Sequence, residues 1–126
     1  MADNTETKIK QDLLIEIQKL HQSYLAIESF LGGKDFDSLE LGMTIQTFKD
    51  SLSRASAFVL ALYNLKGKRV NIPWETLFTS LDYALATISV SSSAKQKTAV
   101  KTILSMSQEQ MEQVLSYFAA LKESLK

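Results

Sequence analysis

Residues 37–62, DSLELGMTIQTFKDSLSRASAFVLAL, decide the fold class. Their apolar side chains recur at alternating steps of four and three residues: Leu41, Ile45, Phe48, Leu52, Ala55, Val59 and Leu62. This spacing puts them on one stripe of an α-helix, a pattern typical of helices that pack nearly parallel or antiparallel. Asp37, with Glu40 three residues later, indicates the N-terminus of this helix, and Gly67 indicates its end.

The same spacing predicts two further helices. Residues 6–31 carry an apolar seam, and Gly32-Gly33 ends it because glycine adopts the left-handed conformation of a C-cap without strain. A third helix opens with Pro73 at its first position, where the missing N–H costs nothing. The repeated serines of residues 89–93 then predict a turn.

Residues 94–125 allow two interpretations. Seven-residue spacing continues through positions 100, 104, 107, 111, 114 and 118, which favours one long helix. Ser107 lies in that seam, however, and a serine there makes more sense as a helix cap. We favour a break near residues 105–107 and keep the single helix as the alternative.

These segments together predict an all-α fold, an antiparallel helical bundle of four to five helices. The 126 residues are 45% hydrophobic, which is enough for one core, so we expect a single domain over residues 1–126. In an up-and-down bundle, residues 32–37 and 90–95 share one end and residues 66–72 lie at the other. Asp35 and Asp37 should then lie near Lys95 and Lys97.

Charge and composition exclude several classes of protein. The 14 basic residues balance the 14 acidic ones, whereas a nucleic-acid binder usually carries a positive excess, so we do not expect a nucleic-acid partner. The balance hides an asymmetry, since residues 1–50 hold 5 basic and 9 acidic groups. There is neither a signal-peptide pattern nor an apolar run long enough to span a bilayer, which predicts a cytoplasmic protein without a membrane partner.

The usual chemistry-bearing patterns are missing from the sequence. With no cysteine there can be no disulfide, thiolate metal site or thiol nucleophile. His21 is the only histidine, and we predict that it is a surface residue. Because a metal site needs three or four converging ligands, we expect no metal and no other cofactor. No phosphate-binding loop or nucleophile elbow occurs. We therefore expect a protein that is not an enzyme.

The loop at residues 66–69 carries the clearest candidate binding residues. Lys66, Lys68 and Arg69 precede Trp74 closely, and Tyr63 lies one turn before them. Three cations with an aromatic ring could hold an anion, a nucleic-acid backbone or an acidic helix. The structural alternative is that the cations cap the negative end of a helix and Trp74 covers the end of the bundle.

Three functions follow from these observations. The leading hypothesis is a non-enzymatic protein–protein interaction module, an adaptor or regulator that binds another protein or a second copy of itself. The alternatives are an anion or nucleic-acid binder that uses the 66–69 loop with Trp74, and a bundle that holds a small apolar ligand in its core.

Overall fold

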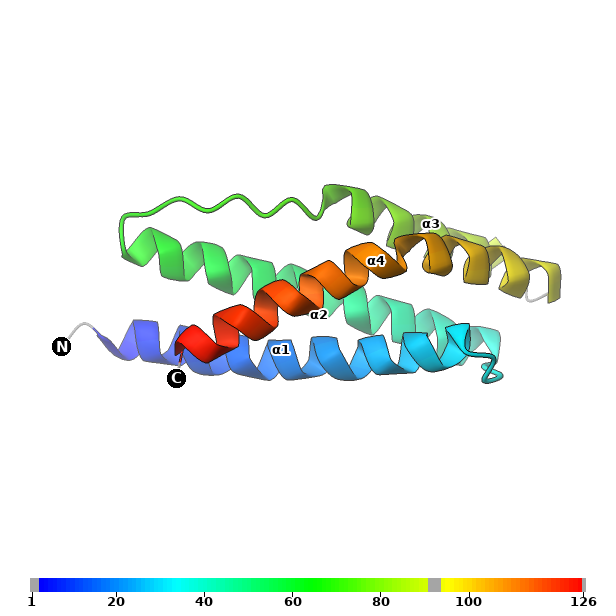
Figure 1. The fold of residues 1–126 in the computed structure, drawn as a ribbon, viewed down its shortest axis with the longest axis horizontal. Coiled ribbons are helices and arrows are strands. Elements are labelled where there is room, and N and C mark those ends of the chain that lie inside the picture. Colours follow the sequence, from blue (N-terminus) through cyan, green and yellow to red (C-terminus); the bar gives the residue numbers. More distant parts are fainter. Residues whose placement is uncertain (1–2, 91–93, 126) are drawn as a thin grey trace.

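The computed structural model describes residues 3–90 and 94–125, and in these residues four helices and no strand are present. They are α1 (Asp3–Leu31), α2 (Ser38–Leu65), α3 (Glu75–Val90) and α4 (Ala94–Leu125). Contacts join α1 to α2, α2 to α3, α3 to α4 and α4 to α1, which makes an up-and-down bundle with one core between the helices (Figure 1). The all-α bundle predicted from the sequence is confirmed, with four helices rather than five.

The predicted helix ends are set by local hydrogen bonds. The Asp37 carboxylate accepts a bond of 2.7 Å from the backbone N–H of Glu40 and caps α2. At the other end, the N–H groups of Gly67 and Lys68 donate to the carbonyls of Asn64 and Tyr63 at 3.0 and 2.8 Å. Gly67 has a φ of 68°, the left-handed conformation that this C-cap requires. Gly33 ends α1 in the same way, with a φ of 108°.

The predicted break near residues 105–107 is wrong, because α4 runs without interruption from Ala94 to Leu125. Ser107 is buried in the seam, and its hydroxyl donates a 2.9 Å bond to the carbonyl of Ile103, one turn earlier. This bond satisfies the hydroxyl inside the helix, so the serine needs no cap geometry. The continuous seven-residue spacing was the correct signal.

The third helix also starts later than predicted. Pro73 lies outside α3, and the carbonyl of Trp74 accepts the first helical bond, 2.9 Å from the N–H of Phe78. Residues 68–74 are extended and run along the bundle before α3 begins (Figure 1). Val70, Ile72 and Trp74 pack against the core while the residues between them are exposed, an alternation of period two. The predicted loop is thus an apolar strap over the C-terminal half of α2.

The predicted arrangement of the bundle ends is confirmed where the structure describes it. Lys97 Nζ lies 3.8 Å from Asp35 Oδ1, which joins the start of α4 to the α1–α2 loop. Asp37 is used as the cap of α2 instead of an ion pair. The side chain of Lys95 and residues 91–93 of the predicted serine turn lie outside the described residues.

Buried side chains of all four helices fill the core. The seam of α2 from Leu41 to Leu62 is buried throughout, with Phe48 fully enclosed. Phe118 of α4 is fully enclosed as well, and Leu13, Leu20 and Ile27 complete the α1 side. Truncating a phenylalanine at such a position costs about 3–5 kcal/mol in other proteins. The stripes read from the sequence therefore account for the core.

Candidate functional site

The surface around α3 combines open grooves with exposed apolar side chains. Two open grooves flank this helix, one of about 580 Å³ against α2 and one of about 420 Å³ against α4. Large apolar side chains stand out beside them: Leu39 is 74% exposed, Met43 62%, Tyr83 66% and Met106 80%. We call this surface, with both grooves, the α3 face.

The lining of the α3 face is uncharged. The groove against α2 is lined by Ser38, Leu39, Gly42, Met43, Gln46, Leu85, Ala86 and Ile88. The groove against α4 is lined by Thr76, Thr79, Ser80, Tyr83, Ile103, Met106, Ser107 and Gln110. Neither set of lining residues contains a charged side chain, although 22% of all residues in the chain are charged. Depletion of charge with exposed Met and Tyr is the composition of the centre of a protein interface.

One charged group beside this face, Asp82, is already paired. Asp82 of α3 lies one turn before Ala86, and its carboxylate forms an ion pair with Lys49 of α2. Lys49 is partly buried, so this pair lies against the helix surface. A partner covering the α3 face would therefore not have to neutralise a free charge at this edge.

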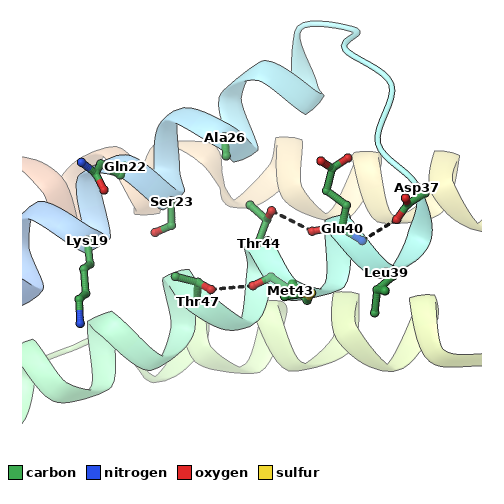
Figure 2. Close-up of a pocket in the computed structure, with 10 residues that line it drawn as sticks. All are labelled: Lys19, Gln22, Ser23, Ala26, Asp37, Leu39, Glu40, Met43, Thr44 and Thr47. Atoms are coloured by element: carbon green, nitrogen blue, oxygen red, sulfur yellow. Dashed lines mark hydrogen bonds between the residues drawn. The ribbon is translucent and has the colours of Figure 1, made fainter.

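A third groove of about 490 Å³ lies between α1 and α2, on the other side of the Leu39–Met43 ridge (Figure 2). Its hydroxyls are already used within their own helices. Thr44 donates to the Glu40 carbonyl at 2.9 Å, and Thr47 donates to the Met43 carbonyl at 2.8 Å. Asp37 is used as the α2 cap, and Lys19 and Glu40 add charged side chains to this lining, unlike that of the α3 face.

The basic loop is placed only partly as the sequence suggested. Lys66, Lys68 and Tyr63 line one hollow of about 150 Å³, together with Lys10 from α1. Arg69 is exposed and does not line this hollow. Glu6 Oε1 lies 3.7 Å from Lys10 Nζ and 3.9 Å from Lys66 Nζ. Lys10 had no sequence signal, because only the packing of α1 beside the end of α2 brings it there.

Trp74 is not part of that cluster. Trp74 is six positions after Lys68 in extended chain, up to about 20 Å away at 3.3 Å per residue. Its ring packs edge-on against Tyr117, with centroids 5.8 Å apart, and Tyr117 packs against Phe118 in the same way. Trp74 thus packs on α4 about two turns before the end of that helix, and does not cover the end of the bundle as the structural alternative proposed.

Two buried polar contacts tie α1 to its neighbours. Glu16 is 7% exposed, with Arg54 Nε of α2 at 3.1 Å from its carboxylate and Lys19 Nζ at 3.8 Å. Tyr24 donates a 3.0 Å bond to Glu112 of α4 and accepts a 3.3 Å bond from Gln108. Both contacts join α1 to a neighbouring helix, Glu16 to α2 and Tyr24 to α4.

Burial shifts the titration of two tyrosines. Burial is the main cause that raises the pKa of Tyr24, while its bond from Gln108 lowers that pKa and the Glu112 carboxylate raises it. Burial likewise raises the pKa of Tyr117, with a smaller contribution from Tyr63. Both tyrosines therefore stay protonated in the folded protein well into alkaline pH.

The described residues offer no metal cluster. No group of three or more His, Asp or Glu side chains converges in residues 3–90 and 94–125. His21 is exposed on α1, as predicted. Within the same part of the chain, no helix is long and apolar enough to cross a membrane.

Comparison with known proteins gives no relative from which a role could be transferred. Neither a protein-family model, nor a curated protein, nor a solved structure matches this chain.

Proposed function

We propose that this protein is a non-enzymatic protein–protein interaction module whose binding surface is the α3 face, and that a second copy of the chain is its partner. The observation that carries the proposal is the uncharged lining of both grooves beside α3, together with the exposure of Tyr83 and Met106. Burying such a surface removes apolar area from water without stripping water from an unpaired charge.

A second copy suits this surface because of charge and shape. A strongly charged partner would bury its own charges against a face that has none to pair with them. A copy of the same face brings neutral residues to both sides of the interface. Each copy also presents ridges, at Leu39–Met43 and at Tyr83–Met106, beside grooves, so a two-fold axis can set the ridge of one copy into a groove of the other.

The test is the oligomeric state measured by analytical ultracentrifugation from micromolar to millimolar concentration. We expect the wild type to form a concentration-dependent dimer, and the double variant Tyr83→Glu/Met106→Glu to raise the dissociation constant at least tenfold. Both side chains are more than 60% exposed, so the fold of the variant should persist, which circular dichroism checks.

A matched control distinguishes association through this surface from nonspecific association through any exposed apolar residue. Ile15 is 51% exposed on α1 and lines neither groove beside α3. Ile15→Glu should leave the dimer unchanged. A wild type that stays monomeric at millimolar concentration would refute the proposal, as would an equal loss of dimer in the Ile15→Glu variant.

A further inference from the structure

At the opposite end of the bundle, the hollow beside the basic loop combines an apolar floor with a cationic rim. Leu62 and Tyr63 of α2 and Leu121 and Leu125 of α4 form the floor. Lys10, Lys66 and Lys68 also line the hollow and provide its cationic rim. We propose that this hollow binds a small apolar carboxylate about the size of one aromatic ring.

Within residues 3–90 and 94–125, a single carboxylate faces the lysines of the rim. Glu6 is the carboxylate that approaches them, and its distances of 3.7 and 3.9 Å exceed the 2.7–2.9 Å of a short charge-assisted hydrogen bond. Lys68 pairs with no carboxylate among residues 3–90 and 94–125. Lys10 and Lys66 thus share one carboxylate and Lys68 has none among the described residues, which leaves room for a second anion.

The backbone holds this arrangement in place. The left-handed Gly67 turns the chain so that Lys68 returns over the end of α2, where its N–H bonds to the carbonyl of Tyr63 at 2.8 Å. The N–H groups of Lys68 and Gly67 also cap the last carbonyls of α2, which would otherwise repel an anion. The turn therefore positions a cation and masks the negative helix end at once.

The volume and the floor define the apolar part of the ligand. The hollow measures about 150 Å³, and an apolar cavity of roughly 150 Å³ can hold a benzene ring. Inorganic phosphate would meet the lysines but leave the leucines without a contact. A benzoate-like acid satisfies both the rim and the floor, so it is the ligand class that we expect.

This site is separate from the α3 face. Gln110 of the α3 face and Leu121 of the hollow, both on α4, are 11 residues apart, about 16 Å at 1.5 Å per residue. Failure of one proposal therefore leaves the other standing, because each has its own residues and its own readout.

The experiment follows amide chemical shifts of the ¹⁵N-labelled protein during titration with benzoate, acetate, benzamide and inorganic phosphate at low salt. We expect benzoate to shift amides around Lys10, Tyr63 and Leu121 and to bind about tenfold or more tightly than acetate. Benzamide, which has the ring without the charge, should not bind, and added salt should weaken benzoate binding.

Two lysine variants provide the matched pair. Lys68→Gln should raise the dissociation constant for benzoate by about two- to fivefold, the range of an exposed ion pair. Lys101→Gln, at an exposed lysine of α4 that does not line the hollow, should leave it unchanged. Equal binding of phosphate or benzamide, an equal effect of both variants, or the absence of shifts in this hollow would overturn the proposal.

Discussion

Replacing Gly42 by alanine tests the structure, because the sign and size of the change in the free energy of unfolding can be worked out in advance. Gly42 lies inside α2 without a positive φ, so its backbone is one that alanine adopts freely. A Cβ built on Gly42 would lie 4.0 Å from Ile88 Cγ2, an ordinary van der Waals contact. Gly42→Ala should therefore gain the full helix propensity of alanine, about 1 kcal/mol, without a steric penalty.

Gly33 provides the opposite case in the same molecule. Space is available there, since a Cβ would meet no atom within 4 Å, but the φ of 108° is strained for any residue with a side chain. Gly33→Ala should cost about 1–2 kcal/mol. The two substitutions add the same methyl group, so a difference in sign can only come from the backbone conformation.

Urea and thermal unfolding followed by circular dichroism would measure both effects. For a chain of this length, a gain of about 1 kcal/mol raises Tm by roughly 3–5 °C. The measurements should be made at micromolar concentration, because Gly42 also lines the α3 face and self-association would add to the stability. Destabilisation by Gly42→Ala would mean that α2 and α3 pack more closely than the structure shows, and the reasoning would fail.

Two further predictions concern α4 and the buried tyrosines. Ser107→Pro should destabilise the protein by about 3 kcal/mol or more because α4 is continuous there, while Ser107→Ala should change stability by less than about 1 kcal/mol. A proline that leaves the stability unchanged would mean that two helices meet at this position. The raised pKa values of Tyr24 and Tyr117 mean that the unfolded state ionises first, so stability should be full below about pH 10 and fall as the pH rises through the folded pKa values. Tyr24→Phe should cost about 1 kcal/mol at pH 7 through the lost bond to Glu112, and Tyr117→Phe almost nothing, since the Tyr117 hydroxyl has no partner in the described structure. In urea unfolding, both variants should lose less stability than the wild type between pH 8 and pH 11. An unchanged dependence of stability on pH would contradict this assignment.

The candidate surfaces were only partly predictable. The basic residues of the 66–69 loop were visible in the sequence, but their grouping with Lys10 depends on α1 packing beside the end of α2. Tyr83 of α3 and Met106 of α4 line the same groove, although they come from different helices. Patterns within one helix cannot show which surfaces become adjacent.

The strap has a local signal in the sequence. Val70, Ile72 and Trp74 alternate with exposed residues, which is the period of an extended chain against an apolar surface. The lysines before them and Pro73 within them favoured an irregular loop and an earlier helix start. The extended conformation is favoured because it packs these three side chains against the part of the core that lies before the start of α3.

The sequence by itself determined the helices, most of their ends and the residues of the core. These features depend on contacts within about five residues, such as the Asp37 cap and the Gly33 and Gly67 turns, and on the 3.6-residue period of a helix. Only the tertiary structure decided that Ser107 is buried in a continuous helix, that Trp74 packs on Tyr117, and that neutral residues gather around α3. Those outcomes depend on which helices are in contact and on which residues along each helix face one another. No single segment carries that information.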